Sequence, residues 1–165
     1  MLDSTTEAVE ELLRLARSDF LSRQPSRDNR ETPPPGSHLE NAIVSKFVSA
    51  YEAADVESLT ALFTEDVVLS MPSLPFEAAG RAAVARFCTA LFGSGRRYDL
   101  VPTRANGQPA FGVYARASSG VRHGTGLVVV SLNGDSICAI TRFDRFVLPR
   151  FGLPRSLPPD WNAGK

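Results

Sequence analysis

One histidine and two carboxylates fall in the part of the sequence that alternates like β-strands. His123 is the natural proton carrier, because the pKa of an unperturbed imidazole lies near neutrality, and Asp99 or Asp144 could pair with it as a general acid or base. Each carboxylate lies near a predicted strand end, where desolvation is weak. Neighbouring arginines such as Arg122 and Arg142 would keep a carboxylate ionised. We therefore predict no catalytic dyad, although one sequence does not fix the strand registers and the enzymatic alternative stays open.

The rest of the composition favours no metal, cofactor or membrane chemistry. Cys88 and Cys138 form no CxxC pair, and two lone thiols predict no metal site. The 18 basic residues balance the 18 acidic ones, so the chain as a whole is not drawn to nucleic acid or to a membrane. Neither a phosphate-binding glycine loop nor a nucleophile elbow is present. No apolar run resembles a signal peptide or a membrane span, which predicts a cytoplasmic protein. Since the sequence contains none of the motifs above, we also predict that the protein has no cofactor.

The beginning of the chain predicts a helix that stands apart from the rest. Ser4 and Glu7 have the spacing of a capping box, and apolar residues then recur at helical spacing as far as Phe20. Residues 23–38 are rich in proline and lack large apolar side chains, so they predict a linker. We divide the chain into a helix over 1–22, this linker, a domain over 39–157 and a tail over 158–165.

Three helices open the predicted domain. An apolar stripe runs through residues 39–51, and Asp55 can cap a second helix that carries Leu59, Leu62 and Phe63. Residues 66–71 read as a short strand that ends at two prolines. Gly80 then precedes the third helix.

The second half of the domain predicts a β-meander. Residues 98–104 and 110–116 read as two strands joined by a tight turn at Asn106-Gly107. Further turns separate strands over 121–132 and 137–146. Helices followed by such a meander predict an α+β domain, in which three helices pack on one face of a curved antiparallel sheet and enclose a pocket.

Several segments resemble a known family. The sequence of residues 51–66 resembles the opening of SnoaL-like domains, which have the nuclear transport factor 2-like cone fold. Four more segments resemble the SnoaL-like C-terminal extension of certain extracytoplasmic-function sigma factors, which are subunits of bacterial RNA polymerase. These segments are residues 71–75, 80–83, 101–110 and 150–154. One departure is Phe76-Glu77-Ala78-Ala79, where the family pattern has aromatic residues.

The N-terminal segment fits the same family. Residues 1–17 resemble the end of sigma region 4, which carries the recognition helix of a helix-turn-helix, and the resemblance implies that Thr5, Thr6 and Arg14 are a remnant of its DNA-binding surface. Sigma region 2 and the first helix of the helix-turn-helix are absent from this sequence. We therefore predict that this chain is one part of a sigma factor and does not work as a sigma factor by itself.

The resemblance also implies a function, a ligand pocket and partners. It implies a regulatory domain that modulates transcription initiation through a ligand pocket or through contacts to sigma-factor core domains or RNA polymerase. The residues assigned to the pocket are Phe47, Tyr51, Met71, Phe87, Phe111 and His123. Two alternatives stay open. One is a SnoaL-like isomerase, cyclase or hydrolase acting on a small apolar molecule, and the other is a homodimer formed through the open face of the sheet.

Overall fold

The computed structural model describes residues 32–162, which form three α-helices, one 3-10 helix and seven strands. The helices are α2 (His38–Glu52), α3 (Val56–Ala61), α4 (Arg81–Phe92) and the 3-10 helix η1 (Arg145–Phe151). The strands are β1 (Phe63–Met71), β2 (Phe76–Ala79), β3 (Tyr98–Ala105), β4 (Gln108–Arg116), β5 (Arg122–Asn133), β6 (Ser136–Asp144) and β7 (Ser156–Leu157). The predicted helix over residues 1–22, with Thr5, Thr6 and Arg14, lies outside the described residues, as does most of the predicted linker.

Side-chain caps start the first two described helices, and the second of them, Asp55, was predicted. The hydroxyl of Ser37 accepts a hydrogen bond from the Glu40 amide at 3.3 Å, and the carboxylate of Asp55 accepts one from the Ser58 amide at 3.1 Å. Such side chains satisfy amides that have no partner inside the helix. One boundary was wrong: α3 ends at Ala61, and Phe63 is the first residue of β1 rather than a helical residue.

The turn at Asn106-Gly107 is confirmed. Asn106 has a φ of 52° and Gly107 a φ of 75°, so both central residues adopt the left-handed conformation that a two-residue hairpin turn requires. The flanking residues Ala105 and Gln108 pair directly, and the register continues to Tyr98 and Ala115. This hairpin fixes β3 against β4 along their whole length.

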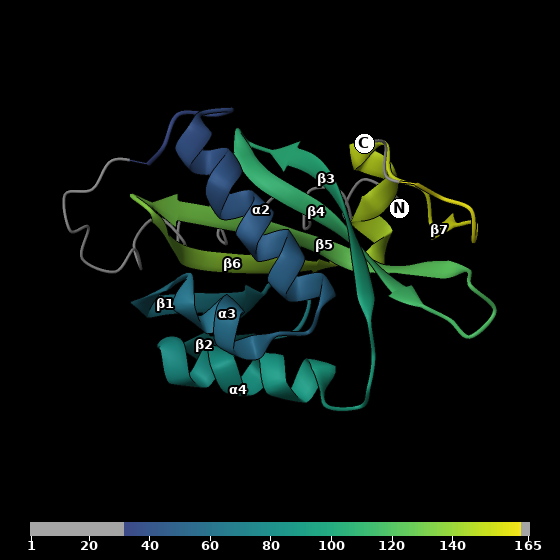
Figure 1. The fold of residues 1–165 in the computed structure, drawn as a ribbon, viewed down its shortest axis with the longest axis horizontal. Coiled ribbons are helices and arrows are strands. Elements are labelled where there is room, and N and C mark those ends of the chain that lie inside the picture. Colours follow the sequence, from purple (N-terminus) through teal and green to yellow (C-terminus); the bar gives the residue numbers. More distant parts are fainter. Residues whose placement is uncertain (1–31, 163–165) are drawn as a thin grey trace, which may run out of the picture. The chain divides into compact units, whose positions relative to one another are not determined.

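The sheet is mixed rather than purely antiparallel, which corrects our expectation. Its strand order is β2-β1-β6-β5-β4-β3, and β1 runs parallel to β6 while the other neighbours are antiparallel. Strand β1 comes before α4 in the chain and joins the meander at its far side (Figure 1). The prolines Pro72 and Pro75 do not end the sheet here. They lie in the connection from β1 to β2, a strand that the sequence pattern did not predict.

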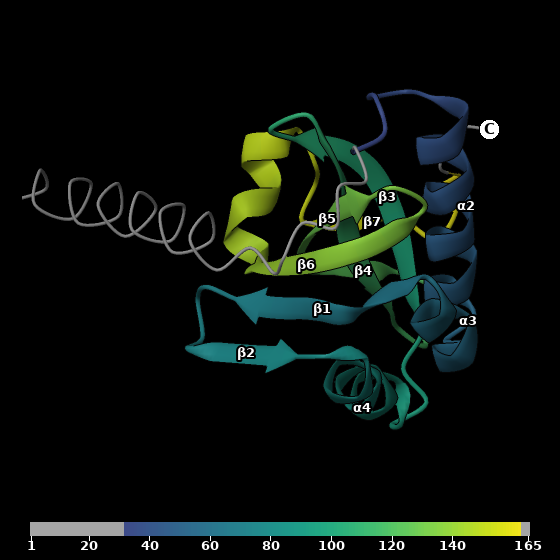
Figure 2. The same ribbon diagram turned by 90° about the vertical axis from the view of Figure 1, so that its left-hand side faces the viewer.

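Alternating side chains give the sheet two buried faces. Phe111 and Val113 of β4 pack toward the helices in the larger core, whereas Ala110 of the same strand packs in a smaller cluster on the other face. Leu148 and Leu153, from η1 and the segment after it, complete that smaller cluster. Figure 2 shows α2 on one side of the sheet and η1 on the other. The three predicted helices therefore cover one face, as expected, and η1 partly covers the second.

The chain end after β6 differs from the prediction. The last strand stops at Asp144, and Phe146 lies in η1 with 72% of its surface exposed instead of ending the strand. Two glycines make room for η1 and its neighbours, because a Cβ on Gly112 would lie 2.9 Å from Leu153 Cδ1 and one on Gly124 only 2.5 Å from Leu148 Cδ1. The sheet face through which a homodimer was left open as an alternative is thus occupied in part by the chain itself.

Candidate functional site

A small cavity lies between the helices and the inner face of the sheet. Its lining comes from α2, α3, α4, β1, β5 and β6, and its volume is about 20 Å³. This is room for roughly one or two water molecules. The lining residues are Phe47, Tyr51, Leu59, Phe63, Leu69, Phe87, Cys88, Leu91, Val128, Ile140 and Arg142. Tyr51, Cys88 and Arg142 are the lining residues whose side chains carry polar atoms, but the surface that faces the cavity is almost wholly apolar.

Tyr51 is held rigidly at the end of α2. Its ring lies 5.6 Å from the ring of Phe47 and 5.2 Å from that of Phe92, centroid to centroid, and the residue is 6% exposed. The hydroxyl is buried and makes no well-formed hydrogen bond within the described part of the chain. Burial raises the pKa of Tyr51 to about 12, although the positive charge of Arg142 acts in the opposite direction. The hydroxyl is therefore neutral at physiological pH and is available as a donor.

Arg142 reaches the cavity from the inner face of β6. It lies on the same strand face as Ile140, two residues before it, and pairs across the ladder with Val128, and both neighbours also line the cavity. Its Nη2 atom makes a long hydrogen bond of 3.5 Å to the hydroxyl of Thr125, and its guanidinium also interacts with the hydroxyl of Tyr51. We had placed Arg142 among the strand arginines but not in the pocket, because its face depends on the register.

The third polar group, the thiol of Cys88, is poorly suited to covalent chemistry. Cys88 is 5% exposed, and burial raises the pKa of its thiol to about 11. A thiol is nucleophilic as the thiolate, which such a pKa disfavours at neutral pH. Within the described residues, no group of three or more His, Cys, Asp or Glu side chains could hold a metal ion.

The predicted pocket residues divide into two groups. Phe47, Tyr51 and Phe87 line the cavity. Met71, Phe111 and His123 do not: Phe111 packs behind Phe47 with its ring centroid 5.5 Å away, Met71 is half-buried at the edge of the larger core, and His123 is exposed. The helical spacing of aromatic residues correctly predicted the cavity residues of α2 and α4. The strand residues that complete the cavity were missed, because the face to which they point depends on strand register.

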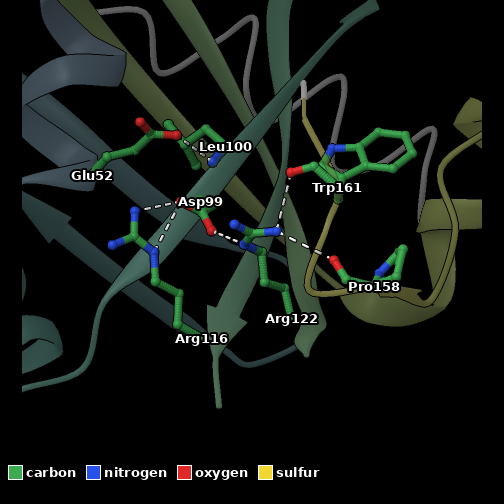
Figure 3. Close-up of polar contacts among 7 residues, drawn as sticks. All are labelled: Glu52, Asp99, Leu100, Arg116, Arg122, Pro158 and Trp161. Atoms are coloured by element: carbon green, nitrogen blue, oxygen red, sulfur yellow. Dashed lines mark hydrogen bonds and ion pairs between the residues drawn. The ribbon is translucent and has the colours of Figure 1, made fainter. Parts of the chain in front are cut away.

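The carboxylate of Asp99 is bound by two arginines, not by His123. Arg116 donates from Nε to Asp99 Oδ1 at 3.0 Å, and Arg122 forms an ion pair with the other oxygen. Arg122 also donates to the carbonyls of Pro158 at 3.4 Å and Trp161 at 3.3 Å (Figure 3). This cluster ties the two edge hairpin strands to the segment after β7, so its role is structural.

The remaining members of the proposed dyad also have other neighbours. The Nδ1 atom of His123 lies 3.4 Å from the hydroxyl of Ser156 on β7. The carboxylate of Asp144 accepts a hydrogen bond from the Phe146 amide at 2.8 Å and thereby caps η1. The described residues thus place His123 outside the cavity. Of its two candidate carboxylate partners, Asp99 binds arginines and Asp144 caps η1.

Comparison with known proteins identifies the family. Residues 44–145 match the model of the SnoaL-like domain family, and the chain belongs to that family. A similar solved structure is that of a candidate ketosteroid isomerase from Kribbella flavida, with a TM-score of 0.56 and 21% identity, covering 66% of this chain and 78% of that one. Another is an NTF2-like protein of unknown function from Mesorhizobium loti, with a TM-score of 0.54 and 20% identity, covering 68% and 95%. These likenesses confirm the predicted SnoaL-like fold.

A second comparison reaches beyond the domain. The chain is 31% identical over 161 residues to the ECF RNA polymerase sigma factor SigG of Mycobacterium tuberculosis, in strain H37Rv and in strain CDC 1551. The alignment covers 94% of this chain and 42% of SigG. The chain thus spans less than half the length of the curated relatives that it matches. Within the described residues, no helix is long and apolar enough to cross a membrane.

Proposed function

We propose that this chain carries the SnoaL-like regulatory domain of an extracytoplasmic-function sigma factor, which modulates transcription initiation without catalysing a reaction. The observation that carries the proposal is the extent of the likeness to SigG. It covers 94% of the chain, whereas the domain model matches residues 44–145 only. The segments on both sides of the domain therefore share in the resemblance. RNA polymerase or sigma-factor core domains are the partners that follow from it, and a cytoplasmic location follows as well.

The cavity supports a non-enzymatic role. A SnoaL-like enzyme that moves protons needs an acid or base beside its substrate, and the cavity lining contains neither a carboxylate nor an imidazole. Sites for drug-sized molecules have volumes of roughly 300 to 1,000 Å³, and a cavity of about 20 Å³ is far smaller. The alternative of an isomerase, cyclase or hydrolase rests on neighbours at about 21% identity, which share the fold.

The first test is the genomic sequence upstream of Met1. An open reading frame that continues upstream in frame and encodes sigma regions 2 and 4 is expected. A ribosome-binding site directly before Met1, with no sigma regions upstream, would contradict the proposal and favour the enzyme.

The second test measures transcription from a cognate promoter in cells. The complete sigma factor is compared with a version that ends before Thr32, at matched protein abundance. Removal of the domain is expected to change promoter output several-fold, and equal output from the two versions would refute a regulatory role. By itself the present chain is expected to show no sequence-selective promoter binding in a gel shift, because its residues 1–17 resemble only the end of sigma region 4.

A further inference from the structure

Three arginines form a row across neighbouring strands, where the β4–β5 hairpin leaves the sheet. Arg116 of β4 lies directly opposite Arg122 of β5. On its other side, the Arg116 amide donates at 3.0 Å to the carbonyl of Arg97, the residue before β3. Ala115, next to Arg116, packs against the core that faces the helices. Because side chains alternate along a strand, the arginine row lies on the outer face.

The row carries more positive charge than its structural role needs. Like charges at directly opposite positions destabilise a sheet. The one carboxylate between them, Asp99, pairs through one oxygen with Arg116 and through the other with Arg122 (Figure 3). Arg122 also donates to two carbonyls of the segment after β7, so it can brace Asp99 alone. The charges of Arg116 and Arg97 are therefore in excess.

This excess charge is accessible from solvent. The side chain of Arg116 is 46% exposed, whereas that of Arg122 is 23% exposed. Arg97 and its neighbour Arg96 are exposed, and no acidic side chain in the described part of the chain forms an ion pair with either. The charge of Glu52 acts on Arg116, but its carboxylate accepts a hydrogen bond from a backbone amide of β3 at 2.9 Å. The surface formed by Arg96, Arg97 and Arg116 is thus positive.

The chemistry of this surface matches phosphate groups. A guanidinium stays charged, is weakly hydrated and binds phosphate or carboxylate oxygens through its planar fork. Neighbouring strands lie about 5 Å apart, and each strand of DNA carries one negative charge per roughly 3.4 Å of helix axis. Arginines on adjacent strands can therefore meet neighbouring phosphates. An acidic protein segment also offers oxygens, but a domain of a sigma factor works beside promoter DNA, which favours DNA as the partner.

We propose that Arg96, Arg97 and Arg116 bind the phosphate backbone of duplex DNA, while Asp99 and Arg122 hold Arg116 in position. This inference rests on the proposed function, since it names the promoter duplex as a partner of the regulatory domain. Phosphate contacts orient a protein on DNA but carry no sequence information. The contact therefore agrees with the lack of sequence-selective binding expected of this chain.

The test measures binding of the complete 165-residue chain to a fluorescently labelled DNA duplex by anisotropy, at a series of sodium chloride concentrations. A dissociation constant on the order of 100 µM is expected at low salt. A plot of log association constant against log salt concentration should have a slope of about −2.7, because each of three phosphate contacts contributes about −0.9. Two duplexes of unrelated sequence should bind equally.

Variants locate the contact. Arg97→Gln removes one contact from an exposed side chain outside the Asp99 cluster, so the fold should persist. It should make the salt slope shallower by about 0.9 and weaken binding about fivefold at low salt. Arg97→Lys keeps the charge and should retain the slope. The matched control, Arg86→Gln, removes the same charge from an exposed site on α4, which packs on the inner face of the sheet, and should bind like the wild type.

Three outcomes would overturn the proposal. The first is no saturable binding at low salt, and the second is equal weakening by Arg97→Gln and Arg86→Gln. The third is a different preferred partner, shown either by tighter binding of single-stranded DNA or by displacement of the duplex by polyglutamate more readily than by unlabelled duplex. These measurements need no polymerase. A failed titration therefore leaves the regulatory proposal standing, and a failed promoter test leaves the measured DNA binding intact.

Discussion

The hydroxyl of Tyr114 on β4 donates a 2.7 Å hydrogen bond to the carbonyl of Pro154, 40 residues further along the chain. It joins the outer face of the sheet to the segment that follows η1. The Gly124 amide makes a second such link, because it donates to the carbonyl of Arg155 at 2.8 Å. Together these bonds hold the segment against strands β4 and β5, and the first prediction concerns this attachment.

Tyr114→Phe is expected to lower the free energy of unfolding by about 1 kcal/mol, because one partly buried hydrogen bond is lost while the ring remains. Urea unfolding measures this change. Hydrogen exchange should localise it, with faster exchange at the amides of Gly124 and Leu153 than in the wild type. Unchanged exchange at both amides would show that the Pro154 contact does not hold the segment.

Gly107→Val tests the hairpin that fixes β3 against β4. The φ of 75° is costly for a β-branched residue, but a Cβ at this position would meet no atom within 4 Å. The expected loss of roughly 1 to 3 kcal/mol therefore comes from backbone strain alone. Gly107→Asn is the matched control, since asparagine tolerates the left-handed region and should cost clearly less. Equal denaturation midpoints for valine and wild type would contradict the turn geometry.

Glu40 gives the domain a predictable response to acid. It is 3% exposed, and its carboxylate accepts a hydrogen bond from Arg104 and another from the Gly36 amide at 3.0 Å. Burial acts to raise the pKa of Glu40, but the two hydrogen bonds and the charge of Arg104 together outweigh it. The net pKa lies below the ordinary value of 4.5.

A lowered folded-state pKa means that the unfolded chain binds the proton first. The stability contributed by Glu40 is therefore fully present above the ordinary pKa of 4.5 and is lost as the pH falls through the lower folded-state value. Urea midpoints measured from about pH 7 down to about pH 3 should drop at the acid end, and less so in Glu40→Gln. Glu57→Gln, at an exposed position, is the control and should keep the wild-type acid dependence. An identical acid response in Glu40→Gln would rule the contribution out.

His123→Ala separates regulation from proton chemistry. His123 is exposed and its imidazole lies beside the Ser156 hydroxyl, so the change should alter stability by less than about 0.5 kcal/mol. Promoter output from the complete sigma factor carrying the change should match the wild type. A collapse of regulation at normal protein abundance would mean that His123 has a chemical role, and the enzymatic alternative would then lead.

The sequence by itself determined the local elements and the family. Ser37 was not singled out as a cap, but the apolar stripe of α2, the cap at Asp55 and the turn at Asn106-Gly107 all follow from interactions between residues close in the chain. Such patterns record local hydrogen bonds and side-chain periodicity, which operate before any tertiary contact forms. The three helices, the meander and the resemblance to SnoaL-like domains were therefore readable in advance.

Only the tertiary structure decided which distant segments meet. The parallel pairing of β1 with β6, the packing of η1 on the outer face and the meeting of Tyr51 with Arg142 join residues far apart in the chain. A shift of one residue in strand register turns every side chain to the opposite face. Arg142 belongs to the cavity and His123 does not, because packing of the whole sheet sets that register and local sequence does not encode it.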